Sequence, residues 1–180
     1  MGLLKNYPLA PAWATRSAIL ALLLAVVGAA AWAPRCSAAR VPVRVLHVID
    51  GDTVVARLGG RRVKVRLLGV DTPELGRDGR PAEPFARTAR RFASDLIRAA
   101  EGVELEIAGD RVDEHGRILG FLWLRLPGRP EPVNLSEELL RAGLADAIRW
   151  FRYPGKQRFL ALEAEARARR RGKWGLGARD

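Results

Sequence analysis

Residues 53–70, TVVARLGGRRVKVRLLGV, decide the fold that the sequence predicts. Two apolar, β-branched runs flank the pair Gly59-Gly60, which is typical of a two-residue β-hairpin turn. In the second run, apolar residues alternate with Lys64 and Arg66, which gives one apolar face and one mostly cationic face. The stretch therefore predicts a hairpin whose outer surface is basic.

The pattern extends outward from this hairpin into further strands and helices. Five strands are expected, over residues 43–49, 53–58, 61–70, 103–108 and 117–126. Helical spacing of apolar residues predicts three helices, over 84–100, 134–143 and 156–171. Gly102 and Gly143 are expected to end the first two helices. This order predicts an α+β fold, a closed five-stranded OB-type β-barrel with three helices; an open α+β sheet is the alternative.

The first 39 residues differ in composition from the rest. Lys5 and Arg16 precede an uncharged apolar run at 18–33, and small residues follow just before Arg40. These features predict a secretory signal peptide, while a membrane anchor that is not cleaved is the alternative. Either way the protein is expected to be secreted, periplasmic or at the cell surface, with membrane contact only through this segment. The predicted boundaries are 1–39 for the leader or anchor, 41–176 for the domain and 177–180 for a tail.

The charge balance points to a polyanionic partner. The chain has 31 Lys+Arg against 20 Asp+Glu, a net charge of +11 and a pI of about 11.2. The leader carries only three of the basic residues and no acid, so the rest of the chain keeps 28 basic against 20 acidic residues, a net charge of +8. Nucleic acid or an anionic membrane surface would suit such a charge, and a merely solvated basic surface is the alternative. One cysteine and two histidines predict neither an internal disulfide nor a zinc site.

Four carboxylates stand at the ends of apolar runs in this basic chain. They belong to IDGDT at 49–53 and VDTPE at 70–74, and they are Asp50, Asp52, Asp71 and Glu74. Each motif alone is also typical of an ordinary turn, because Asp, Gly and Pro favour turns.

The hairpin brings these acids toward one arginine. A two-residue loop pairs Thr53 with Arg66, so Arg66 arrives within one residue of Asp52. Ideal register would put the two side chains on opposite faces, and only a bulge or a strand end at Gly51 would bring them together. Asp71 leaves the same end of the strand, so acids and an arginine converge at one rim.

This set of side chains suits phosphodiester chemistry. Clustered carboxylates require a cation, and oxygen donors suit Ca²⁺ or Mg²⁺ rather than zinc. Arg66, with Arg117 at the start of a later strand, could bind a phosphate beside that cation. A spare carboxylate could orient or deprotonate water for in-line attack.

Five ordered motifs resemble those of the staphylococcal nuclease (thermonuclease) family. They are IDGDT at 49–53, VRLLGVDTPE at 65–74, D-x-x-G-R at 113–117, LLRAGLADA at 139–147 and EARARRRGKWG at 165–175. The resemblance covers about residues 43–176. It implies an OB-fold nuclease that depends on Ca²⁺ and cleaves DNA and RNA. Mg²⁺, which also prefers oxygen ligands, is the alternative cofactor, and the protein is expected to be a monomer.

The resemblance also implies a role for each matching residue. Asp52, Asp71 and the Thr72 carbonyl would ligate calcium. Glu74 would act on the attacking water, and Arg66 and Arg117 would contact the phosphate.

The resemblance is less complete in the segment expected to contact nucleotides. Where the family carries tyrosines, this chain reads IRWFRYPGK at 148–156, with Phe151 at one aromatic position and Arg149 at the other. Arg149, Trp150, Phe151 and Tyr153 are therefore the expected nucleic-acid contacts. A non-catalytic OB-fold binding module is the alternative function, and a structural protein whose basic patch binds an anionic polymer is a third. The intact acids and arginines favour the enzyme.

Overall fold

The computed structural model describes residues 39–76 and 79–175. The chain divides into two units, Met1–Ser37 and Ala38–Asp180, and all described residues belong to the second. The predicted leader, apart from Ala39, and the predicted tail lie outside the described residues. Within the described part of the chain, no helix is long and apolar enough to cross a membrane.

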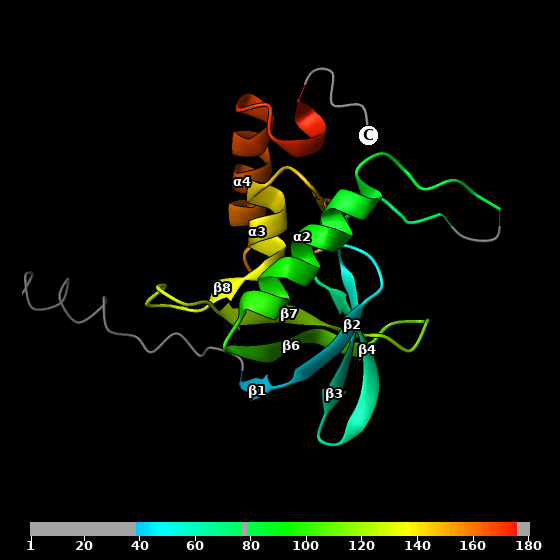
Figure 1. The fold of residues 1–180 in the computed structure, drawn as a ribbon, viewed down its shortest axis with the longest axis vertical. Helices are drawn as coiled ribbons and strands as arrows, with labels where there is room; N and C mark the ends of the chain where they lie inside the picture. The colour runs from blue at the N-terminus through cyan, green and yellow to red at the C-terminus, as the bar shows by residue number, and fades with distance from the viewer. Residues whose placement is uncertain (1–38, 77–78, 176–180) are drawn as a thin grey trace, which may run out of the picture. The chain divides into compact units, whose positions relative to one another are not determined.

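One mixed sheet forms the body of the domain (Figure 1). Its strands are β1 (Arg40–Pro42), β2 (Arg44–Val48), β3 (Thr53–Leu58), β4 (Arg61–Leu67), β6 (Gly102–Val112), β7 (Ile118–Arg125) and β8 (Val133–Asn134). The order is β1-β6-β7-β4-β3-β2, and β8 pairs with β7. A separate two-stranded sheet joins β5 (Val70–Asp71) to β9 (Asp146–Ala147). All five predicted strand segments are present, whereas β1 and the three two-residue strands were not predicted.

The sheet is not the continuously hydrogen-bonded, closed barrel that the sequence analysis expected. Its two end strands, β1 and β2, do not pair with each other in the described structure. They are instead consecutive in the chain and separated only by Val43, whose N–H donates to the Val103 carbonyl at 2.9 Å. β1 pairs with β6 and β2 pairs with β3, so the two ends of the sheet are joined through the chain at Val43.

The β3–β4 hairpin has the predicted turn and register. Gly59 and Gly60 have φ angles of 53° and 83°, values that glycine adopts at little cost. The turn pairs Leu58 with Arg61 and Thr53 with Arg66. Every second residue of the hairpin therefore points into the core, where Val54 and Val65 are fully buried.

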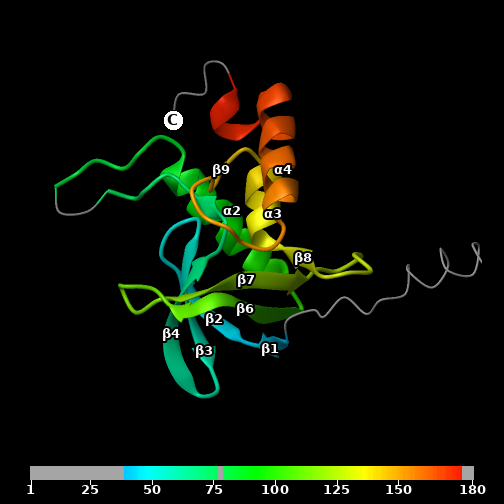
Figure 2. The same ribbon diagram turned by 180° about the vertical axis from the view of Figure 1, so that it is seen from behind.

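Three helices gather at one end of the sheet, and the β3–β4 hairpin projects from the other end (Figures 1 and 2). They are α2 (Ala86–Ala99), α3 (Leu135–Arg141) and α4 (Lys156–Ala168), and the 3₁₀ turn η2 (Gly172–Trp174) follows α4. Gly143 ends α3 as predicted, with a φ of 71° and N–H groups of Gly143 and Leu144 bonded back to the last turn. The prediction for Gly102 is wrong, because α2 already ends at Ala99 and Gly102 begins β6.

Candidate active site

A sharp bend between β2 and β3 positions the first acidic motif. Residues 49–52 belong to neither strand, and the Ile49 N–H donates to the Thr53 carbonyl at 2.9 Å. Asp52 therefore precedes the first residue of β3, and its carbonyl accepts from the Leu67 N–H at 2.7 Å. Because the chain leaves strand geometry here, Asp52 does not follow the side-chain alternation that would have placed it on the opposite face of the sheet from Arg66.

Asp52 is enclosed by the second acidic motif. Its side chain is 1% exposed, and its Oδ2 accepts from the Thr72 N–H at 2.7 Å and the Thr72 hydroxyl at 3.0 Å. Gly51 permits this approach, since a Cβ there would lie 2.7 Å from Cγ2 of Thr72 and 2.9 Å from Cβ of Ala89. A residue larger than glycine would thus push the two motifs apart.

Arg66 ties the two predicted metal-binding carboxylates together. Its guanidinium forms one ion pair with Asp52 and a second, 2.8 Å long, from Nη2 to Oδ1 of Asp71. The Arg66 side chain is only 15% exposed, while that of Asp71 is 52% exposed. The carboxylates of Asp52 and Asp71 therefore lie within reach of one cationic group, although they are 19 positions apart in the chain.

The charge of Asp52 is incompletely compensated. Burial raises the pKa of Asp52 above its ordinary value, Arg66 opposes the rise and the neighbouring Asp50 adds to it. Two hydrogen bonds from Thr72 also lower this pKa without outweighing burial. A carboxylate in this state would gain from a further positive charge.

The donor chemistry at this position fits a hard divalent cation. Asp52 and Asp71 offer carboxylate oxygens at one rim, and oxygen is the ligand atom that Ca²⁺ and Mg²⁺ prefer. Over residues 39–76 and 79–175, no group of three or more acidic, histidine or cysteine side chains forms a ready ligand cluster. The side chains present therefore suit an ion that also takes backbone carbonyls and water as ligands.

A cavity of about 360 Å³ opens beside these carboxylates. It is lined by Ile49, Asp50, Thr53, Lys64, Glu74, His115 and Arg117. Asp50 and Thr53 connect it to the buried acid, because Oδ1 of Asp50 accepts from the Asp52 N–H at 3.2 Å and the Thr53 hydroxyl donates to Asp52 at 3.1 Å. Glu74 and Arg117 thus share one cavity whose wall continues into the Asp52 cluster.

Parallel pairing of β4 with β7 brings the second predicted arginine to the cavity. Val65 pairs with Ile118, so Arg117 comes beside Lys64. Asp113 then holds Arg117 by accepting its backbone N–H at 2.9 Å and its Nε–H at 2.8 Å. Although partial burial tends to raise the pKa of Asp113, these hydrogen bonds from Arg117 hold it below its ordinary value, so the pair stays ionised.

Three residues of the site had no role in the sequence analysis. Asp113 was noticed only as part of D-x-x-G-R, and Lys64 and His115 reach the cavity through the fold. The alternation of charge along β4 was the available signal for Lys64. His115 is positioned by the loop, whose Asp113 carboxylate accepts the His115 N–H at 2.9 Å, and the sequence carried no signal for it.

Glu74 begins the long loop that precedes α2. Its backbone N–H donates to Oε2 of Glu83 at 3.0 Å, and the Glu83 N–H donates to its carbonyl at 3.0 Å. These two bonds fix both ends of the loop, and the exposed Glu74 side chain stands at the cavity wall.

The four predicted nucleic-acid contacts divide into two exposed rings and two residues tied into the domain. Trp150 is 75% exposed and Phe151 37% exposed, with ring centroids 6.4 Å apart. Tyr153 is buried, and its hydroxyl lies 3.0 Å from the Ile148 carbonyl. Arg149 forms a 2.6 Å ion pair with Glu163, which is 0% exposed. Arg149 and Tyr153 therefore hold the segment in place, while Trp150 and Phe151 project from it.

These observations define an OB-type domain with an acid-and-arginine site at the rim of its sheet. The family model described as staphylococcal nuclease homologue matches residues 64–175, and the chain belongs to this family.

Three curated relatives agree with this assignment. Micrococcal nuclease from Shigella flexneri is 29% identical over 166 residues, 91% of this chain and 87% of the relative. Thermonuclease from Staphylococcus hyicus is 30% identical over 133 residues, 73% of this chain and 74% of its own length. Thermonuclease from Staphylococcus intermedius is 33% identical over 127 residues, 71% of each chain.

Proposed function

We propose that this protein is a nuclease, a hydrolase of phosphodiester bonds in nucleic acid. The observation that carries the proposal is the position of Arg66, held between Asp52 and Asp71 beside a cavity that Glu74 and Arg117 line. Membership of the staphylococcal nuclease family supports it, as do relatives named micrococcal nuclease and thermonuclease.

The two arginines are the proposed phosphate ligands. A guanidinium presents a planar set of N–H donors that matches phosphate oxygens. Arg117 is already oriented by Asp113, and Arg66 by Asp52 and Asp71, so neither must be ordered when substrate arrives. Donors fixed in this way stabilise the additional charge that develops on a five-coordinate phosphorus.

Glu74 is the proposed partner of the attacking water. Its carboxylate is the predicted acid that lines the cavity outside the buried Asp52 cluster, on the wall shared with Arg117. There it would orient the water through a hydrogen bond and accept its proton as the water oxygen bonds to phosphorus. The bond from phosphorus to the leaving sugar oxygen would break in the same step, and solvent water would protonate that oxygen.

A calcium ion is the proposed cofactor, with Mg²⁺ as the alternative. Asp52, Asp71 and the backbone carbonyl of Thr72 would hold it. When bound, the ion supplies positive charge that neutralises phosphate oxygens. The raised pKa of Asp52 supports this role, because a nearby cation would favour the charged form of that buried carboxylate.

Both DNA and RNA are the proposed substrates. Trp150 and Phe151 offer ring faces to any base, and such stacking contributes about 1–3 kcal/mol per base with little sequence preference. Arg149 and Tyr153 would support this contact indirectly, by holding the segment. We further propose that residues 1–39 export or anchor the domain and that it acts as a monomer.

Incubation of the full chain with plasmid DNA and with single-stranded RNA, in calcium and in EGTA, tests the function. We expect both substrates to be cleaved in calcium and to remain intact in EGTA, and we expect Glu74→Gln to bind DNA but cleave it far more slowly. Binding without cleavage by the parent in calcium and in magnesium would identify a non-catalytic binding module. Full activity in EGTA would remove calcium from the mechanism.

A further inference from the structure

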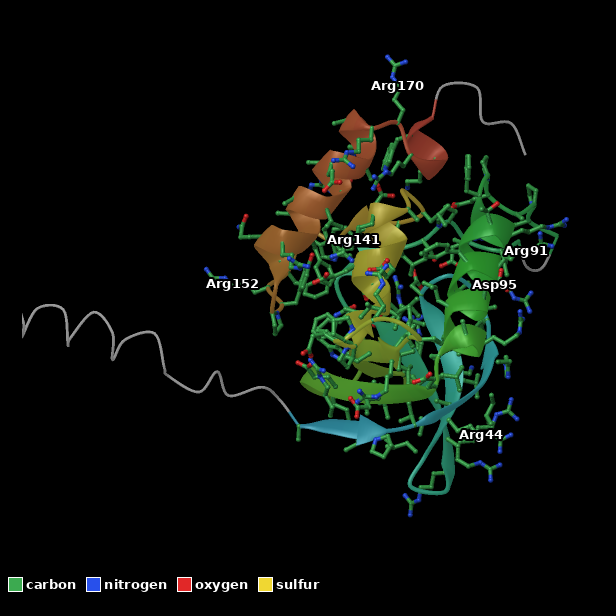
Figure 3. All side chains as sticks on the ribbon, turned by 60° about the vertical axis from the view of Figure 1, so that its left-hand side comes forward. Arg44, Arg91, Asp95, Arg141, Arg152 and Arg170 are labelled. Carbon is green, nitrogen blue, oxygen red and sulfur yellow. The ribbon has the colours of Figure 1, made fainter. Side chains whose placement is uncertain are left out.

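The outer face of the β3–β4 hairpin carries a row of three arginines. Strand register aligns Arg44 of β2 with Arg57 of β3, and Arg57 with Arg62 of β4. All three are exposed, and they share the face of the sheet that points away from the core. Figure 3 shows Arg44 beside the hairpin, among other nitrogen-tipped side chains that extend into solvent.

This row continues toward the candidate active site. Two residues further along β4, Lys64 occupies the same outer face and lines the cavity. Two residues beyond Lys64, Arg66 reaches Asp52 and Asp71. The distance along the strand from Arg62 to Arg66 is about 13 Å, which is longer than the spacing between neighbouring phosphates of a nucleic-acid strand.

The arginine row has no acidic partner in the part of the chain that the structure describes. Among the described residues, no carboxylate forms an ion pair with Arg44, Arg57 or Arg62. Like charges that face each other across neighbouring strands destabilise a sheet. A local cost of this kind, with no compensating ion pair among the described residues, indicates that a ligand supplies the opposite charge.

We infer that Arg44, Arg57, Arg62 and Lys64 form a track for the phosphate backbone of a long nucleic acid whose scissile bond lies in the cavity. This inference rests on the proposed nuclease function and extends it, because it makes chain length a property that the enzyme recognises. The track binds phosphates irrespective of base sequence, since guanidinium and ammonium groups contact only the backbone. Its continuity with the cavity through Lys64 favours nucleic acid over a lipid surface.

The test compares two full-chain variants that remove the same charge. The track variant is Arg44→Gln/Arg57→Gln/Arg62→Gln. The control variant is Arg91→Gln/Arg125→Gln/Arg129→Gln, which alters three exposed arginines on α2, at the end of β7 and in the following turn. Each is assayed on a 30-nucleotide single strand and on a dinucleotide that can occupy the cavity but not the track.

For the track variant, we expect kcat/KM on the 30-mer to fall about tenfold or more, while kcat/KM on the dinucleotide stays within twofold of the parent. Binding of the 30-mer in EGTA gives a second readout that needs no catalysis. There the slope of log Kd against log salt should decrease by about 2, because three phosphate contacts are lost. The control variant should change each quantity less than twofold.

Three results would overturn the inference. One is an unchanged kcat/KM and salt slope for the track variant, and another is an equal loss on the dinucleotide, which would place these arginines at the cavity itself. The third is that the parent protein binds anionic phospholipid vesicles more tightly than the 30-mer and loses that binding in the track variant. If the parent cleaves neither substrate, the proposed function fails, while the salt slope in EGTA still decides whether the track binds nucleic acid.

Discussion

Two buried carboxylates of the domain differ in how their charge is compensated. Glu163 of α4 is 0% exposed and forms ion pairs with both Arg149 and Arg167, each 2.6 Å long. Asp52 is almost as buried, but it has Arg66 on one side and a second acid, Asp50, in its own loop. The opposite pKa shifts follow from this difference. Hydrogen bonds from the arginines outweigh burial and lower the pKa of Glu163, whereas burial raises that of Asp52.

This difference separates a structural ion pair from a site that can accept a further cation. The carboxylate of Glu163 is paired with two arginines and joins α4 to the segment before it, and Asp146 of β9 likewise pairs with Arg167 and Lys173. Asp52 instead shares a single arginine, Arg66, with Asp71. The carboxylates that share this arginine are the ones proposed to hold a metal ion, whereas the row of Arg44, Arg57 and Arg62 is the surface proposed to bind a polyanion.

The largest loss of activity is expected for Arg117, because this arginine is ion-paired like those of Glu163 but also lines the cavity. Arg117→Ala should lower kcat/KM by about 100- to 1000-fold, the usual cost of removing a donor that stabilises transition-state charge. Arg66→Ala should have an effect at least as large, but it also leaves Asp52 buried without its ion pair.

Arg167→Ala is the matched control for Arg117→Ala. Arg167 is paired to Glu163 and Asp146 and lies outside the cavity. Its removal should lower the melting temperature and leave kcat within about threefold. Equal losses of kcat in both variants would mean that ion pairing alone explains Arg117.

The same site shows which features could be predicted from the sequence and which could not. The Gly59-Gly60 turn fixed the pairing of Thr53 with Arg66, because a two-residue loop leaves one register. The sequence did not decide whether Asp52 and Arg66 would meet, since that depended on where β3 begins, and the structure resolves it with a bend over 49–52. Local patterns could not give the parallel β4–β7 pairing that brings Arg117 to the cavity, because it joins segments far apart in the chain.

The structural carboxylate should be costly to neutralise. Glu163→Gln should lower the free energy of unfolding by about 2–3 kcal/mol at pH 7, below the usual cost of breaking a buried pair because both arginines are partly exposed. The pKa of Glu163 is below its ordinary value of 4.5, so its stabilisation is present above that value and is lost as the pH falls through the folded pKa. Urea unfolding of both proteins at pH 7 and at pH 3 checks this. If the free energies of unfolding of the two proteins differed by the same amount at both pH values, the stabilising ion pairs of an ionised Glu163 would be contradicted.

Neutralising Asp52, the buried carboxylate of the candidate active site, should have the opposite effect on stability. Because the folded pKa of Asp52 lies above 3.8, its charge destabilises the native state once the pH has risen through that folded pKa. Without metal, Asp52→Asn should therefore be as stable as the parent, or more stable, at pH 7. Calcium at 100 times its Kd should stabilise the parent by about 2.7 kcal/mol and the variant hardly at all. Thermal melts in calcium and in EGTA measure both effects, and equal stabilisation of the two proteins would place the ion elsewhere.

Substitution of the arginine row should give the smallest change in stability. It should raise the melting temperature, whereas a substitution that removes contacts ordinarily lowers it. Arg44, Arg57 and Arg62 face one another across three strands, so replacing them with glutamine removes like-charge repulsion worth about 0.2–1 kcal/mol per pair. In the absence of nucleic acid, the melting temperature should rise by about 3 °C, and the rise should shrink as salt screens the charges. The triple substitution of Arg91, Arg125 and Arg129 should leave it within about 1 °C, since these residues do not face one another. A fall in the melting temperature of the row variant would show that these arginines stabilise the sheet, and their alignment would then need no ligand to explain it.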